Sequence, residues 1–189
     1  MQWLLKLSRG IDRLNDTIGS GIYWLCFAMV LVAAFNSIVR YGGRFVGVDW
    51  SSNAYLEAQW YLFSVVFLLG AAVTLRDDAH VRVDVVYGRL GERARTWIDL
   101  VGTLAFLIPF SVLALVVSWP AVANSWKILE GSPDPGGLPR YPIKSLILVA
   151  FVLVILQGVA QAIRCVSRLR GNAADPEAAA ASPESGGDA

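Results

Sequence analysis

The sequence predicts an all-α membrane protein with four transmembrane helices. Three observations predict this fold class: the composition, four long apolar stretches and the distribution of basic residues. Of the 189 residues, 56% are hydrophobic and only 16% are charged, which is too apolar for a soluble domain of this length. A lipid bilayer is the solvent that fits this composition.

Each of the four apolar stretches is long enough to cross a bilayer as a helix, since an α-helix rises about 1.5 Å per residue and the hydrocarbon is roughly 30 Å thick. They cover about 18–39, 54–75, 97–119 and 143–163. Spans of this length must be helices because the bilayer core offers no water to satisfy backbone polar groups, and strand spans would be shorter and alternating. We therefore expect residues 18–168 to form a four-helix membrane domain.

The two ends of the chain are predicted to lie outside this domain. Residues 1–17 are predicted to form an amphipathic helix on the membrane surface, because apolar side chains such as Trp3, Leu7 and Ile11 recur at helical spacing while charged ones take the other face. A plain charged lead-in to the first span is the alternative. Residues 169–189 are rich in Ala, Pro, Glu, Ser and Gly, and we expect them to form a disordered tail.

Basic residues predict the orientation, because short cytoplasmic loops carry an excess of Lys and Arg. The N-terminus, the loop between the second and third spans and the C-terminal flank together hold eleven Lys or Arg residues, and the other two loops hold five. Both termini and the central loop are therefore expected to be cytoplasmic.

Residues that support catalysis or cofactor binding are scarce. Cys26 and Cys165 lie in or near apolar segments, and His80 is the one histidine, so no Cys or His pair has metal-ligand spacing. We expect no enzyme activity, no metal and no cofactor. Net charge is +1, and the basic residues gather at segment ends, which argues against a nucleic-acid surface.

Glu57 is the main candidate inside a span, because an ionisable group in a membrane segment often has a function. It lies about one turn into the second span, close to the extracytoplasmic end. Three roles stay open: structural pairing with water or a basic partner, a coupling role in transport, and a contact between subunits.

Two helix faces are candidates for packing. Gly70 lies among small residues that let another helix approach closely. Gln157, Gln161, Arg164 and Arg168 follow one another at intervals of four, three and four residues and so line one stripe. This stripe predicts either a polar seam against a partner protein or intramolecular packing with arginines that reach the headgroups.

The connecting segments have distinct character. Pro109 is expected to kink the third span, whose helix is expected to continue to a stop at Gly131. Four prolines and two glycines in residues 132–142 predict a structured extracytoplasmic turn. The charged segment 75–87, with His80, Arg82 and Asp84, is expected to be a loop or helix edge at the membrane surface.

Over about residues 10–168 the chain resembles the DctQ-type small membrane subunit of tripartite ATP-independent periplasmic (TRAP) transporters. Four segments carry the resemblance: 57–63 (EAQWYLF), 70–76 (GAAVTLR), 80–84 (HVRVD) and 97–100 (WIDL). Within that family, the start of 57–63 and the segment 136–144 (GGLPRYPIK) look most like the branch labelled for 2-oxo acids, mannitol or chloroaromatic compounds.

The resemblance implies a function and partners. A large polytopic subunit would move substrate and sodium, a soluble periplasmic protein would capture a small organic acid, and this chain would support the large subunit in the bacterial inner membrane. Residues taken as candidates for the partner interface are Glu57, Trp60, Gly70, Arg76, His80, Arg82, Asp84, Asp99, Gln157 and Gln161. No transport-site residue carries over from the family.

Two other functions remain open. A membrane anchor for a redox enzyme is one, although it would need axial histidines within the helices. The other is a small homo-oligomeric exchanger that uses Glu57.

Overall fold

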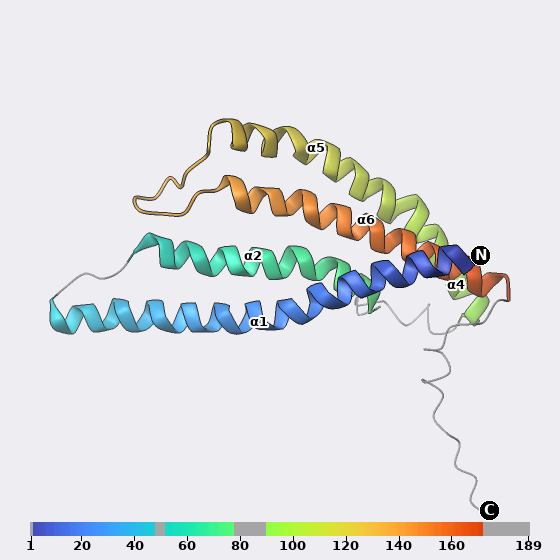
Figure 1. Ribbon diagram of the computed structural model, residues 1–189, viewed down its shortest axis with the longest axis horizontal. Coiled ribbons are helices and arrows are strands. Elements are labelled where there is room, and N and C mark those ends of the chain that lie inside the picture. The colour runs from blue at the N-terminus through green and yellow to red at the C-terminus, as the bar shows by residue number, and fades with distance from the viewer. Residues whose placement is uncertain (1, 48–51, 78–89, 172–189) are drawn as a thin grey trace, which may run out of the picture.

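The structure, a computed structural model, describes residues 2–47, 52–77 and 90–171 (Figure 1). Its elements are α1 (Gln2–Val46), α2 (Asn53–Arg76), α4 (Glu92–Gly102), the π-helical turn η1 (Thr103–Leu107), α5 (Ile108–Lys127) and α6 (Tyr141–Leu169). α4, η1 and α5 follow one another without a gap and form one rod. The described chain is all-helical, and four helices are long and apolar enough to cross a membrane, which confirms the predicted class.

The helices run alternately up and down, so the molecule has two ends (Figure 1). The terminal end holds the start of α1, the end of α2, the start of α4 and the end of α6. The loop end holds the opposite ends and the 128–140 loop. Toward the loop end the order across the molecule is α1, α2, α6, α5, and toward the terminal end α1 crosses onto α6. α6 therefore packs against every other described helix, whereas α5 packs mainly on α6.

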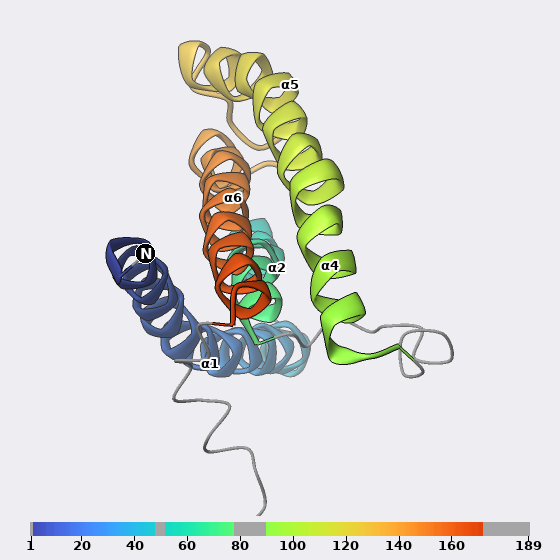
Figure 2. The same cartoon turned by 90° about the vertical axis from the view of Figure 1, so that its right-hand side faces the viewer.

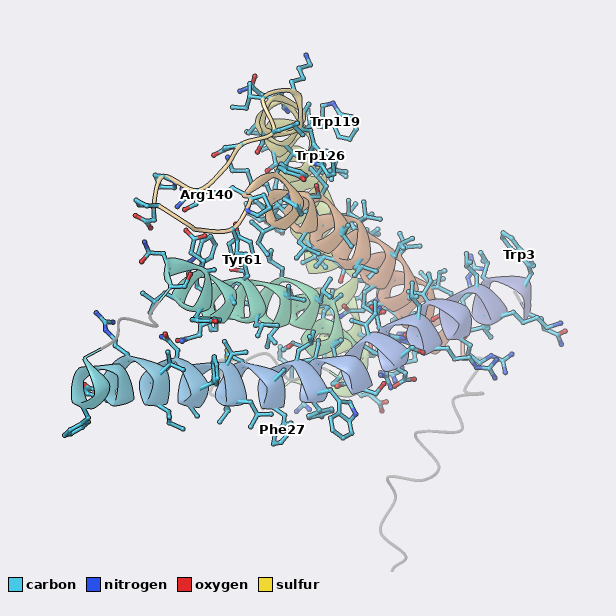
Figure 3. The ribbon with its side chains drawn as sticks, turned by 60° about the vertical axis from the view of Figure 1, so that its left-hand side comes forward. Trp3, Phe27, Tyr61, Trp119, Trp126 and Arg140 are labelled. Atoms are coloured by element: carbon cyan, nitrogen blue, oxygen red, sulfur yellow. The ribbon has the colours of Figure 1, made fainter. Side chains whose placement is uncertain are left out.

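The interior of this arrangement is more polar than its exterior. The largest fully buried side chains are Gln157, Asn15, Ser8, Ser111 and Ser125. Large apolar side chains line the outside instead; Phe27, for example, is 56% exposed and points away from the other helices (Figure 3). Such an outside is stable in hydrocarbon and not in water, so the distribution of side chains supports a membrane location.

α1 is one continuous helix of 45 residues, with no break where the predicted surface helix meets the first span. Figure 1 shows its N-terminal part inclined to the rest. Residues 2–17 are helical as expected, but part of this segment packs on α6, with Ser8, Ile11 and Asn15 buried. Its place at the membrane surface stays a prediction.

Pro109 lies just after a π turn in the rod formed by α4, η1 and α5. Because proline has no amide hydrogen, the helix before it cannot keep its regular pattern, and it forms the π turn η1. The amide of Ile108 donates to the carbonyl of Thr103, five residues back. A Cβ on Gly158 of α6 would come within 3.2 Å of Ile108 Cγ1 and Leu107 Cδ2, so this glycine lets α6 approach the turn closely.

The expected stop of this rod at Gly131 is wrong. α5 ends at Lys127, and Leu129 takes the left-handed conformation with φ 46°. The amide of Leu129 donates to Trp126 O at 3.3 Å and that of Glu130 to Ser125 O at 3.0 Å, a Schellman pattern. Glycine is the usual residue at this position, so the prediction placed the stop at Gly131, two residues beyond Leu129.

Candidate partner interface

Glu57 anchors the proline-rich loop to α2. Glu57 is 3% exposed, and each of its two carboxylate oxygens accepts a hydrogen bond. The hydroxyl of Ser132 donates to Oε1, and the backbone amide of Leu138 donates to Oε2. Structural pairing with water or a basic partner was one of three open roles, and the partners in the structure are instead a hydroxyl and an amide of the loop.

Two neighbours on α2 hold the same loop by its carbonyl oxygens. Asn53 donates from Nδ2 to Pro135 O at 3.0 Å, and the Tyr61 hydroxyl lies 2.9 Å from Pro139 O and 3.3 Å from Leu138 O. Figure 3 shows Tyr61 pointing from α2 toward the loop that carries Arg140. Asn53, Glu57 and Tyr61 are called the loop anchor below.

The two adjacent glycines of the loop, Gly136 and Gly137, are required for different reasons. Gly136 has φ 73°, which L side chains rarely adopt. Gly137 has no room for a side chain, because a Cβ there would lie 2.7 Å from Glu57 Oε2 and 2.5 Å from Ser132 Cβ. The loop can therefore close over Glu57 only with glycine at position 137.

An ion pair between Glu130 and Lys144 closes the base of the loop. The Glu130 carboxylate accepts from the Lys144 ammonium and from the Ser125 hydroxyl, the latter at 2.6 Å. These two donors hold the pKa of Glu130 below its ordinary value of 4.5. Arg140 also lies at this base, because its amide donates to Glu130 O at 2.8 Å, and its guanidinium lies 6.0 Å from the centre of the Trp60 ring.

The α1–α6 polar cluster, formed by Asp12, Asn15, Gln157 and Arg164, lies near the terminal end. Asn15 Nδ2 donates to Gln157 Oε1 at 2.6 Å, and Gln157 Nε2 donates to Asp12 Oδ1 at 3.1 Å. Arg164 Nη1 lies 2.6 Å and 2.7 Å from the two oxygens of Asp12. The side chains of Asp12 and Arg164 are 22% and 21% exposed, so this pair is partly withdrawn from solvent.

Asp12 and Asn15 were not among the predicted site residues. Asp12 lies on the charged face of the predicted surface helix, opposite its apolar side chains. The signal that could have found them is the spacing of Ser8, Asp12 and Asn15, four and three residues apart, which places three polar side chains on one face opposite the glutamines of the fourth span.

The interface candidates do not form one patch. Gln157 is fully buried within this chain, and Gln161 Oε1 is buried without a hydrogen-bond partner among the described residues. Arg76 pairs with Asp16 of α1, and a Cβ on Gly70 would lie 3.9 Å from Ile22 Cδ1, so both face α1. Asp99 is half-buried on α4.

Trp60 is the one candidate that is plainly at the surface within the described part of the chain, with 40% exposure. His80, Arg82 and Asp84 lie outside the described residues. A partner that binds this protein would contact mainly the exposed apolar sides of the helices. The polar candidates in the described part of the chain would then support that surface without contacting the partner directly.

Comparison with protein families decides the class of the protein. Residues 29–168 match the family described as tripartite ATP-independent periplasmic transporters, DctQ component. The chain belongs to the DctQ family. No curated protein and no solved structure matches it.

Membership identifies this DctQ protein as the small membrane subunit of a tripartite transporter. The family is a transporter component and not an enzyme family, and the four apolar helices agree with a multi-pass protein of the inner membrane. The matched region begins within α1 and ends in the last turn of α6, so it includes Gln157 and Arg164 of the α1–α6 polar cluster but not Asp12 or Asn15.

Proposed function

We propose that this DctQ protein is a fixed support in the membrane for a large transport subunit. The large subunit takes up a small organic acid delivered by a periplasmic binding protein, and a sodium gradient drives the uptake. Membership of the family supports the tripartite assembly. A 2-oxo acid is the substrate class we propose, from the resemblance of segments 57–63 and 136–144 to one branch of the family.

The main observation in favour of a supporting role is that ionisable side chains form hydrogen bonds and ion pairs between elements of this chain. Glu57 binds the loop between α5 and α6, Asp12 binds Arg164, and Asp16 binds Arg76. A coupling carboxylate would have to release and rebind protons or ions during transport, whereas Glu57 is occupied on both oxygens by its own chain. Helices tied in this way form a rigid wall against which a moving subunit can work.

We also propose that the terminal end lies in the cytoplasm and that the loop end faces the periplasm. The excess of Lys and Arg at the terminal end supports this orientation. The loop anchor then lies on the side from which a binding protein approaches.

Co-purification tests the proposal directly. An affinity tag at the C-terminus, behind the predicted disordered tail, leaves the helices untouched, and native membranes are dissolved in mild detergent. A much larger polytopic protein in stoichiometric amount is the expected result. A chain that elutes alone as a homo-oligomer would contradict the supporting role and bring forward an exchanger built on Glu57.

Trp60→Ala tests one contact. Because Trp60 is exposed on α2, its loss should lower the amount of large subunit recovered if that side of α2 is covered in the complex. Trp24→Ala is the matched control, since Trp24 is 74% exposed on α1. Equal recovery with both variants would remove Trp60 from the interface.

A further inference from the structure

The first part of α1, residues 2–17, has an apolar stripe that the fold leaves exposed. Trp3, Leu7 and Leu14 are four and seven residues apart, so they share one face of the helix, and they are 70%, 41% and 46% exposed. The face that packs on α6 is a different one, since it holds the buried Ser8 and Asn15. Packing on α6 therefore does not cover this apolar stripe.

A basic face borders the apolar stripe. Lys6, Arg9 and Arg13 follow one another at intervals of three and four residues, and all three side chains are exposed. Lys6 and Arg13 directly precede Leu7 and Leu14, which places these cations beside the stripe. Within the described part of the chain no carboxylate pairs with the basic face, and the Arg9 side chain donates only to a carbonyl of its own helix.

The two acidic residues of the same segment are engaged elsewhere. Asp12 binds Arg164 of α6, and Asp16 binds Arg76 of α2, which also lies 3.7 Å from Asp77. In the sequence the segment has three cations and two carboxylates, a net charge of +1. In the fold both carboxylates are turned to arginines of other helices, so the three cations are left without a carboxylate of their own segment.

Contacts with α6 indicate the depth of this segment. The Ser8 hydroxyl donates to Ala160 O at 3.4 Å, and Asn15 Nδ2 donates to Gln157 Oε1 at 2.6 Å. Both partners lie in the last turns of the fourth apolar stretch, which ends at about residue 163. Seven residues along α1 thus pass only three along α6, so the segment crosses α6 obliquely and stays near the end of that stretch.

This combination of features fits the surface of an anionic bilayer. Surface helices are held by the apolar area that enters the acyl boundary and by the attraction of their basic residues to anionic lipid. Tryptophan is enriched at this level, because its ring is apolar and its N–H is polar. A lipid surface without net charge would use the apolar stripe but would gain nothing from the basic face.

We propose that residues 2–17 bind anionic phospholipid, with the apolar stripe among the acyl chains and the basic face at the phosphates. The pairing of Asp12 and Asp16 with other helices keeps this face cationic. The sequence predicted a place at the membrane surface, and the preference for anionic lipid is the new claim. It goes beyond the proposed transport function and does not depend on it.

Native mass spectrometry of the purified full chain, together with any subunit that co-purifies, tests the lipid preference. Phosphatidylglycerol and phosphatidylcholine are offered in equal amounts in the same micelles. We expect the protein to retain more phosphatidylglycerol, because only this lipid carries a net negative charge. Equal retention of the two lipids by the unchanged chain would overturn the proposal.

Variants locate the preference on α1. Lys6→Gln with Arg13→Gln should lower the ratio of retained phosphatidylglycerol to phosphatidylcholine about tenfold or more, since each basic residue near the surface adds to the attraction. Arg40→Gln with Lys127→Gln is the matched control, because it removes the same charge from exposed positions at the loop end. An equal fall with both pairs would indicate general attraction and would contradict a site on residues 2–17.

Arg76→Gln tests the part played by the paired acids. This change releases Asp16 beside the basic face, so retention of phosphatidylglycerol should fall. Arg76→Gln with Asp16→Asn removes both charges and should restore retention. A double variant as weak as the single one would mean that Arg76 itself holds the lipid, which would contradict the assignment to the basic face.

A protein that covers this face is the other outcome to be distinguished. It would leave the lipid ratio of Lys6→Gln with Arg13→Gln unchanged and would lower the amount of co-purified large subunit instead. That result would overturn the lipid proposal. All of the substituted basic positions on α1 are exposed, so these variants should fold, and the lipid preference of the unchanged chain gives an answer without them.

Discussion

At the scale of single residues, the loop between α5 and α6 depends on Gly137, where any side chain would displace its neighbours. The carboxylate of Glu57 and the side chain of Ser132 fill the space where a Cβ of residue 137 would stand. Gly136 differs, because its requirement is a positive φ in open space. The paired glycines thus satisfy one steric and one conformational demand.

Gly137→Ala should destabilise the protein by about 1–3 kcal/mol, because the added methyl group must displace Glu57 or the loop. Thermal unfolding in detergent measures the change, and tryptic cleavage after Arg140 reports on the loop. Gly131→Ala is the control, since it has open space and no positive φ. Equal stability of the two variants would mean that the loop does not close tightly over Glu57.

Glu130 should make stability depend on pH. Its pKa is lower in the folded protein than its ordinary 4.5, so its contribution is complete above that value and is lost as the pH falls through the folded pKa. We expect the unfolding midpoint of the unchanged protein to fall between about pH 7 and about pH 3 more than that of Glu130→Gln. Parallel curves for the two proteins would show that Lys144 and Ser125 do not stabilise the ionised form.

The sequence identified some of these residues and missed others for clear reasons. Glu57 was found because a carboxylate in an apolar stretch is conspicuous, but Ser132 and Leu138 are 75 and 81 residues away and become its partners only when α2 packs beside the loop. Asn15 was missed because it lies in a segment with charges on one face, where a neutral amide carries no signal of burial.

At the scale of elements, α6 organises the molecule. It packs on α1, α2, α4, η1 and α5, and its specific contacts include Gly158 against η1 and Gln157 within the α1–α6 polar cluster. The number of long apolar helices followed from the apolar runs alone. The crossing of α1 onto α6 did not, because it depends on hydrogen bonds among residues more than 140 positions apart.

A double-mutant cycle should measure how much the pair of Asp12 and Arg164 stabilises the packing of α1 on α6. Asp12→Asn, Arg164→Gln and the combined variant should give a coupling energy of roughly 0.5–3 kcal/mol, because the pair is partly buried and shares Gln157. Unfolding in mixed detergent micelles measures each variant.

The pair of Asp16 and Arg76 is the comparison, since Asp16 is 55% exposed and surface pairs contribute about 0–1 kcal/mol. A coupling for Asp12 and Arg164 no larger than that of the exposed pair would contradict a fastening role for the α1–α6 polar cluster.

At the scale of the whole molecule, the alternation of four helices places both ends of the described chain at one end of the protein (Figure 2). The pattern of basic residues predicts that this end faces the cytoplasm. A cysteine at Asp134, an exposed loop position, should react with an impermeant maleimide in intact cells, whereas a cysteine at Arg170 should react only after lysis. Cys26 and Cys165 are first replaced by alanine. The reverse pattern would invert the proposed orientation.

The open order of α1, α2, α6 and α5 has a consequence for tolerance to mutation. Most large apolar side chains lie on the outer faces of the helices, so most apolar positions form a boundary with whatever surrounds the chain. Substitutions at those positions should leave the fold of the isolated chain unchanged and should affect only its contacts with lipid or with another protein. A mutational scan scored on expression would therefore find the outer faces silent, and the same scan scored on assembly would outline the side that a second protein covers.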